Sequence, residues 1–157
     1  MTKSTDNLAS WADLEAEASG IAAAGRDLLA KQGAASPLLA TVRGDAPPRI
    51  HPVTVAIADG ALYVFLLDSA KRRDLVEDGR FALHGYQDPE MPTEFSVRGR
   101  ARLVEAGPLR ARVADGWYFE VDDSYWLFEL RIASAILGER AADEWPPRYA
   151  RWSAASA

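Results

Sequence analysis

The stretch from Asp59 to His84 constrains the fold of this chain more than any other part of the sequence. It opens with Asp59-Gly60, a dipeptide typical of the tight turn of a β-hairpin. Ala61 to Leu67 follows as a continuous apolar run, which is short enough for a strand covered on both faces. The stretch therefore predicts a hairpin whose second strand belongs to the interior of a sheet.

A short helix is predicted after this strand, with Asp68 or Ser69 as its N-cap and Gly79 as its end. Its charges are opposite to those that the helix dipole favours. The first turn is basic and the last is acidic, in the residues Lys71, Arg72, Arg73, Glu77 and Asp78. One interpretation is an anion held by free N–H groups, a capping hydroxyl and cationic side chains. The other is a solvated helix face, eased by an Arg73–Glu77 ion pair. Charge order alone leaves both open.

Composition narrows the class of protein. The 157 residues predict one domain, residues 1–157. A net charge of −5 argues against a nucleic-acid partner. The sequence contains no Cys, so disulfides, a thiolate nucleophile and cysteine metal sites are excluded. No segment approaches the roughly 20 apolar residues of a membrane span, and we see no secretion signal. We therefore expect a cytoplasmic protein with no membrane partner.

The remaining elements follow from periodicity. Residues 8–32 are predicted as one helix, because Ser10 and Asp13 resemble a capping box and an apolar stripe follows them. About six antiparallel strands are predicted in residues 36–137, at 36–43, 49–58, 61–67, 80–86, 94–104 and 125–132. Residues 133–139 either prolong the last strand or leave it. Such a meander favours a small barrel with peripheral helices. Residues 143–157 hold two Trp and a Tyr, so we expect them to dock on the body or on a second subunit.

Two strands carry features that a plain strand does not need. Pro52 cannot donate to a ladder, so it implies an edge, a bulge or a backbone that faces something else. Arg49 and His51 make one end of the same strand polar, while its remainder is apolar. In residues 94–104, three alternating arginines predict a solvated face, with contact to a partner subunit or ligand as the alternative. Gly99 permits a bulge or a close approach of backbone. These arginines are Arg98, Arg100 and Arg102.

Familiar catalytic motifs do not occur in the sequence. With only two histidines, His51 and His84, a metal site is not expected. There is no Gly-x-Ser-x-Gly, Gly-x-Gly-x-x-Gly or Walker-type loop. Antiparallel pairing would instead bring Arg49 and His51 near the start of the helix at Ser69 and Lys71. Such a group would surround one phosphate-sized position beside an apolar wall.

Six segments, in this order and spacing, resemble the pyridoxamine 5′-phosphate oxidase-like family of flavin-binding split β-barrels. They are Leu39-Ala40-Thr41-Val42-Arg43, Pro48-Arg49-Ile50-His51-Pro52-Val53, Asp59-Gly60-Ala61-Leu62-Tyr63-Val64, Ser69-Ala70-Lys71-Arg72-Arg73-Asp74-Leu75, Gly79-Arg80-Phe81-Ala82-Leu83-His84 and Phe95-Ser96-Val97-Arg98-Gly99-Arg100-Ala101. The resemblance covers nearly the whole chain and implies a homodimer with two FMN sites at the subunit interface.

The resemblance also implies roles for particular residues. Ser69 and Lys71 match the family's Ser-x-Lys phosphate grip, and His51 falls near the position of a cationic phosphate ligand. The backbone around Pro52 and Val53 would face the isoalloxazine ring. Glu94 lies near the position from which the partner chain reaches the cofactor. The implied cofactor-binding residues are Arg49, His51, Pro52, Val53, Ser69, Lys71 and Arg72.

The sequence departs from the family at its end. Oxidases of pyridoxamine phosphate carry Arg-Leu-His-Asp-Arg there, whereas this chain carries Arg148-Tyr149-Ala150-Arg151-Trp152. Tyr149, Arg151 and Trp152 are therefore candidates for shaping a different substrate side. The function implied is an FMN-dependent oxidoreductase acting on a small organic molecule, with no side chain evident as acid or base. The alternatives are a deazaflavin-dependent reductase and a non-catalytic flavin- or haem-binding protein.

Overall fold

The computed structural model describes residues 7–30, 36–85, 90 and 93–155. In this part of the chain the helices are α1 (Trp11–Glu17), α2 (Ser19–Ala30), α3 (Ala70–Glu77) and α4 (Pro108–Asp115). The strands are β1 (Leu38–Thr41), β2 (Arg49–Pro52), β3 (Val55–Ala58), β4 (Ala61–Leu66), β5 (Arg80–His84), β6 (Thr93–Val104), β7 (Trp126–Glu139) and β8 (Arg148–Ser153). No helix among these residues has both the length and the apolarity needed to cross a membrane.

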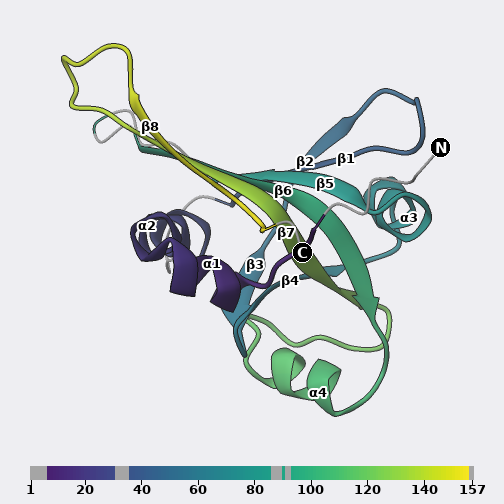
Figure 1. Cartoon of the computed structure of the whole chain (residues 1–157). Coiled ribbons are helices and arrows are strands. Elements are labelled where there is room, and N and C mark those ends of the chain that lie inside the picture. Colours follow the sequence, from purple (N-terminus) through teal and green to yellow (C-terminus); the bar gives the residue numbers. More distant parts are fainter. Residues whose placement is uncertain (1–6, 31–35, 86–89, 91–92, 156–157) are drawn as a thin grey trace.

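The strands form one antiparallel sheet that curls into an open barrel (Figure 1). Its order is β2-β1-β5-β6-β7-β4-β3, with β8 added on β7. The two ends of this path, β2 and β3, are separated in sequence only by Val53 and Thr54. The chain therefore joins the two edges of the sheet, and the split β-barrel expected from the sequence is confirmed.

The described residues form eight strands, more than the predicted six. Residues 49–58 were predicted as one strand, but this segment changes partner from β1 to β4 around Val53 and so forms two. Residues 148–153 add a further strand, because the C-terminal segment docks on its own chain by pairing with β7. The predicted turn at Asp59-Gly60 is confirmed, with φ of 48° and 72° and β3 paired to β4 on either side.

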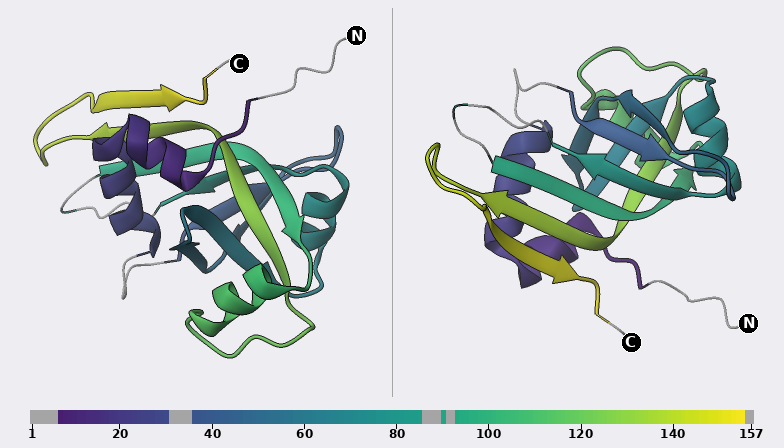
Figure 2. Two further views of the ribbon diagram at one scale, coloured as in Figure 1. Left: turned by 60° about the horizontal axis from the view of Figure 1, so that its bottom comes forward. Right: turned by 90° about the horizontal axis from the view of Figure 1, so that it is seen from above.

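β7 is the longest strand and has different neighbours along its length. One edge pairs with β6 throughout. The other pairs with β4 at residues 126–129, meets Ala9 at Ile132, and pairs with β8 at residues 134–139. The end of the β7–β8 hairpin projects from the body as an arm, here defined as residues 134–153 (Figures 1 and 2). Residues 133–139 thus prolong the strand.

The N-terminal helix predicted over residues 8–32 is instead two helices, as far as residue 30. The capping box of Ser10 and Asp13 is confirmed. α1 ends at Ala18, which has φ of −143° and ψ of 63° and donates to Leu14 O. The chain turns there because α1 lies near β4 whereas α2 contacts β3, β6 and β7.

The core lies inside the barrel and below α1 and α2. Trp11 is fully buried and packs edge-on against Phe95. A Cβ on Gly25 of α2 would lie 2.5 Å from the Phe95 ring, so this glycine lets the helix approach the sheet. A second cluster beneath α4 includes Tyr63, Phe65 and Trp117. The helices therefore close the barrel from two sides.

Candidate functional site

The start of α3 is built as the sequence predicted. The Ser69 hydroxyl accepts a hydrogen bond from Arg72 N at 3.3 Å and donates one to Leu67 O at 3.0 Å. Ser69 is therefore the N-cap. Asp68, just before the cap, forms ion pairs with Arg72 at 3.4 Å and Arg73 at 3.2 Å. This acid offsets part of the positive charge in the first turn.

Arg72 is further engaged by β7 and the loop that precedes it. Its guanidinium lies 4.1 Å from the centroid of the Trp126 ring, and its Nη1 donates to Ser124 O. This stacking holds the Arg72 side chain along α3. The Arg73–Glu77 pair considered from the sequence is not the contact found, because Arg73 pairs with Asp68 and Glu77 pairs with Arg43.

Asp74 joins α3 to the β1–β2 hairpin, and sequence reasoning missed it. Its carboxylate is 1% exposed and accepts a hydrogen bond from the Thr41 hydroxyl at 2.8 Å. It also pairs with Arg43 at 3.1 Å and with Arg49 Nε at 3.1 Å. The signal in the sequence was an acid directly after three basic residues, and its partners lie more than 20 positions away in the chain. The structure thus brings Arg49 to α3, as expected, and shows it bound to Asp74.

Lys71 is the cation at the start of α3 without such a partner. Its side chain is half-buried and makes no hydrogen bond or ion pair with any residue that the structure describes. Asp74 follows it by three positions, so both lie on the same side of the helix. Lys71 therefore lies one turn closer to the helix start than the Arg49–Asp74 contact.

The predicted strand residues lie at the edge of the sheet. β2 pairs only with β1 among the described strands, so Pro52 needs no second ladder partner. Arg49 and His51 pair with Thr41 and Leu39, which point into the core. His51 Nε2 is buried and has no hydrogen-bond partner within the described residues. The polar end of this strand thus faces inward, toward α3.

The C-terminal candidates lie at the other end of the sheet (Figure 1). Trp152 Nε1 donates to Glu17 Oε2 at 2.9 Å, and Arg151 lies 5.8 Å from the Tyr149 ring centroid. Glu94 lies 3.7 Å from His84 Nε2, on the β5–β6 pair. Figures 1 and 2 place β8 and α3 on opposite sides of the molecule. Within one chain, Tyr149, Arg151 and Trp152 are therefore not brought to Ser69 and Lys71.

Known structures share this arrangement of strands and helices. PhzG from Burkholderia lata 383, in complex with tetrahydrophenazine-1-carboxylic acid, matches with a TM-score of 0.61 and 16% identity over 83% of this chain and 82% of its own. A Listeria innocua protein assigned as a pyridoxamine 5′-phosphate oxidase matches with a TM-score of 0.56 and 19% identity, over 78% and 95%. HutZ, the heme storage protein of Vibrio cholerae, matches with a TM-score of 0.56 and 15% identity, over 78% and 87%.

This chain has the fold of the pyridoxamine 5′-phosphate oxidase-like split barrels. The resemblance expected from the sequence is thereby confirmed at the level of the fold. No family model matches the sequence, and no curated protein matches it either. The solved split barrels include a protein assigned as a pyridoxamine 5′-phosphate oxidase and a heme storage protein, so the fold alone does not select a cofactor.

The start of α3 in this split barrel fits a phosphate group. Lys71 contributes an uncompensated ammonium, and the N–H groups of Ala70 and Lys71 belong to a first turn with no intrahelical acceptors. Such N–H groups and the helix dipole favour an anion. Arg49 and Arg72 are held by Asp74 and Trp126, which fixes their positions near α3. These hydrogen-bond donors suit a monophosphate rather than a metal ion, and no metal-ligating cluster occurs in the described residues.

Proposed function

We propose that this chain is an FMN-dependent oxidoreductase acting on a small organic substrate. The observation that carries the proposal is the unpartnered, half-buried Lys71 beside the Ser69-capped first turn of α3, in a split barrel. Taking a cation partly out of water without a partner costs free energy, and a ligand of opposite charge would offset that cost. A flavin phosphate has that charge.

The residues around α3 would divide the work of binding. Lys71 and the first-turn N–H groups would hold the phosphate, while Ser69 keeps the helix start in place through its cap. The backbone at Pro52 and Val53, at the sheet edge, would lie against the ring. The flavin itself supplies hydride chemistry, and the protein supplies orientation and exclusion of water.

A homodimer is part of this proposal. Ser69 and Lys71 belong to the start of α3, which lies across the molecule from β8 (Figure 1), and Glu94 pairs with Gly138 on the arm. A second copy could bring its own Glu94, Tyr149 and Arg151 to the site. In a two-fold symmetric dimer each subunit would do this for the other, which gives two sites. PhzG was solved with a tetrahydrophenazine carboxylic acid, which favours a small ring compound as the class of substrate.

A second candidate is a protein that binds haem or flavin without turnover. Two observations favour it: HutZ shares the fold, and His51 Nε2 has no partner within the described residues. A deazaflavin coenzyme would use the same phosphate position and remains the alternative on the enzyme side.

Spectroscopy of the full chain separates these functions. We expect the protein mixed with FMN to retain it through gel filtration and to show flavin absorbance. Anaerobic bleaching by NADH or NADPH would support the oxidoreductase, whereas a bound but inert flavin would support a carrier. If the protein retains only reduced deazaflavin, or binds only hemin with a Soret band, that cofactor takes the place of FMN in the proposal. If none of the three is retained, the proposed function is wrong.

A further inference from the structure

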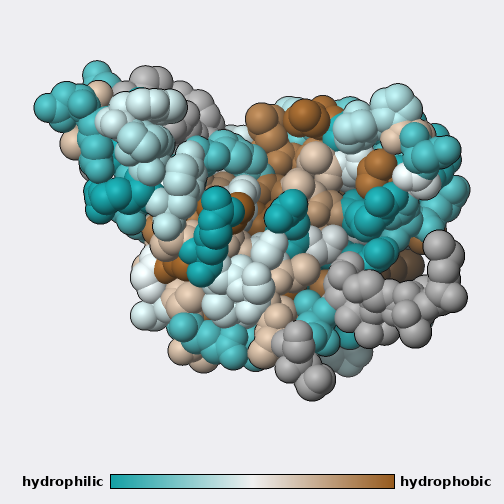
Figure 3. Space-filling view, turned by 45° about the horizontal axis from the view of Figure 1, so that its top comes forward, coloured by the Kyte–Doolittle hydropathy of each residue, from teal (hydrophilic) through white to brown (hydrophobic). Residues whose placement is uncertain are grey.

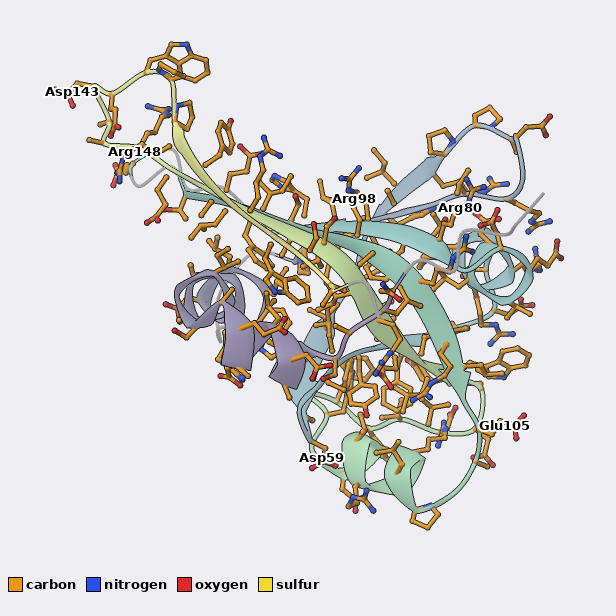
Figure 4. All side chains as sticks on the ribbon, viewed as in Figure 1. Asp59, Arg80, Arg98, Glu105, Asp143 and Arg148 are labelled. Atoms are coloured by element: carbon orange, nitrogen blue, oxygen red, sulfur yellow. The ribbon has the colours of Figure 1, made fainter. Side chains whose placement is uncertain are left out.

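The carboxylate of Asp74 is the point where α3 meets both strands of the β1–β2 hairpin. Its Oδ2 accepts a hydrogen bond from the Thr41 hydroxyl at 2.8 Å and one from Arg49 Nε at 3.1 Å. Its Oδ1 accepts one from Arg43 Nε at 3.2 Å. Figure 4 shows side chains with nitrogen and oxygen atoms gathered between α3 and this hairpin. Figure 3 shows hydrophilic surface at the same end of the molecule, at the right of the view. Both oxygens of the buried carboxylate are thus engaged.

Arg49 is held by Asp74 at one end of its guanidinium only. The contact runs through Nε, and the structure describes no partner for the terminal nitrogens Nη1 and Nη2. Arg43 differs, because its Nε and Nη2 lie 3.2 and 3.1 Å from Asp74 Oδ1. Its Nε also lies 3.3 Å from Glu77. A guanidinium that uses only Nε on a carboxylate keeps two nitrogens with which it can bind a phosphate in bidentate fashion.

The position of Arg49 relative to Lys71 follows from the strand register and the helix period. Arg49 lies opposite Thr41 in the β1–β2 pair, and both bind the same oxygen of Asp74, so the guanidinium is fixed against α3. Lys71 precedes Asp74 by three positions, and residues at this spacing are neighbours on a helix, with Cβ atoms ~5–6 Å apart. A phosphate that meets the ammonium of Lys71 is therefore within reach of the terminal nitrogens of Arg49.

The charge balance of this group suits an anion. The cations are Arg43, Arg49 and Lys71. The acids are Asp74 and Glu77, so the group keeps a positive charge. An arginine side chain has many rotamers, and fixing it on binding costs free energy. Because Asp74 holds Arg49 in one place before a ligand arrives, less of that cost falls on the binding step.

We propose that Asp74 is a positioning residue for the cofactor phosphate, because it sets the guanidinium of Arg49 so that Nη1 and Nη2 meet the phosphate beside Lys71. This role rests on the proposed function, since it requires a phosphate at the start of α3. It gives Asp74 a part in selecting a phosphorylated flavin over the same flavin without its phosphate. The competing role of Asp74 is purely structural, with Arg49 contributing nothing to the ligand.

Flavin fluorescence quenching on the full chain tests this role through one ratio, the dissociation constant of riboflavin divided by that of FMN. A structural defect weakens binding of both flavins, whereas a lost phosphate contact lowers the ratio. Arg49→Gln should lower the ratio roughly ten- to hundredfold, the range for a hydrogen bond to a charged group. Asp74→Asn keeps an oxygen for the Thr41 hydroxyl but removes the charge that holds Arg49, and should lower the ratio roughly fivefold or more. The double variant should have a ratio no lower than that of Arg49→Gln, because Asp74 acts through Arg49.

Thr41→Val is the matched control. It removes the other donor to Asp74 Oδ2 and leaves the Arg49 contact in place, so it should lower the free energy of unfolding without changing the ratio. Arg49→Lys keeps the positive charge but lacks the Nε that Asp74 holds. It should lose most of the ratio, and it decides the question if Asp74→Asn does not fold.

The wild-type ratio tests the proposed function separately. If wild type binds FMN no more tightly than riboflavin, the phosphate site fails and the role of Asp74 fails with it. If wild type prefers FMN and Lys71→Ala lowers that preference, but Asp74→Asn and Arg49→Lys keep the wild-type ratio, only the role of Asp74 is wrong. A Thr41→Val ratio as low as that of Asp74→Asn would also overturn this role, because damage to the hairpin would then explain both.

Discussion

Asp74 and Lys71 lie three residues apart on one helix, and they differ in whether their charge has a partner. Asp74 is buried and receives three donors, from Thr41, Arg43 and Arg49. Lys71 receives nothing from the residues that the structure describes. The paired charge of Asp74 joins α3 to β1 and β2, whereas the charge of Lys71 is the one that the proposed phosphate would meet. Each residue therefore has its own test.

Lys71→Ala should weaken FMN binding by about 1.5–3 kcal/mol, because one charge-assisted hydrogen bond to the phosphate is lost. Riboflavin lacks the phosphate, so its affinity should not change. Flavin fluorescence quenching measures both constants. Arg73→Ala, which removes a neighbouring cation already paired with Asp68, is the matched control and should leave both near wild type. An unchanged FMN affinity in the Lys71→Ala variant would contradict the proposed phosphate site.

Asp74→Ala should lower the free energy of unfolding by about 1.5–3 kcal/mol, since the buried Thr41 hydroxyl loses a charged acceptor. The two arginines are partly exposed and can turn to water, which limits the loss. Urea denaturation measures the difference. Asp68→Ala removes an acid whose side chain is 65% exposed, and should change stability by less than about 1 kcal/mol. Equal losses in the two variants would contradict the structural role given to Asp74.

Elements meet closely at the crossing of β6 and β7 at Gly99 and at the turn from α3 into β5. At the first, a Cβ on Gly99 would lie 1.8 Å from Arg131 O. At the second, Asp78 accepts hydrogen bonds from Arg80 Nε at 2.7 Å and from Gly44 N at 2.7 Å. Gly79 follows with φ of 87°, a conformation that favours glycine.

Gly99→Ala should destabilise the fold by at least about 1–3 kcal/mol, because the added methyl group meets backbone that cannot move aside. Gly20→Ala is the matched control. Its Cβ meets nothing within 4 Å in α2, and it should stabilise by about 0.5–1 kcal/mol through helix propensity. Thermal unfolding of both variants measures the contrast, and a neutral Gly99→Ala would contradict the observed crossing.

Asp78 predicts a pH dependence of stability. Its hydrogen bonds with the Arg80 side chain, and then with the backbone of Gly44 and Arg80, hold its pKa well below the ordinary value in the folded state. Between the two pKa values the unfolded chain binds more protons, so stability rises with pH there. The contribution is complete above about pH 4 to 5 and is lost as the pH falls below that.

Asp78→Asn tests this dependence. The difference in unfolding free energy between wild type and variant should be largest near neutral pH and should shrink between pH 4 and the acid limit of the measurement. Urea denaturation at a series of pH values gives the curve. A difference that is the same at pH 7 and in acid would show that the carboxylate charge contributes nothing at this turn.

At the scale of the whole molecule, the two halves of the proposed cofactor site lie apart. The helix α3, which begins with Ser69 and Lys71, is at one end of the sheet and β8 is at the other (Figure 2). The proposed dimer would unite them. Sedimentation velocity of the full chain should therefore give twice the 17.1 kDa of one chain. A monomer that binds FMN at full stoichiometry would contradict the dimer and leave the phosphate site standing.

Local signals in the sequence determined the elements that need only near neighbours. The turn at Asp59-Gly60, the caps at Ser10 and Ser69, and the docking of the C-terminal segment were all predictable, because their hydrogen bonds or apolar content lie within a few residues. The sequence also showed its resemblance to the split barrels.

Only the tertiary structure decided which charges are paired. Asp74 meets Thr41 from 33 positions away, and Arg98 stays unpaired while Arg100 and Arg102 on the same strand do not. It also decided where residues 49–58 break into two strands, since the chain there leaves β1 for β4. Partners so distant in the chain are set by sheet order and register, which periodicity along one strand does not encode.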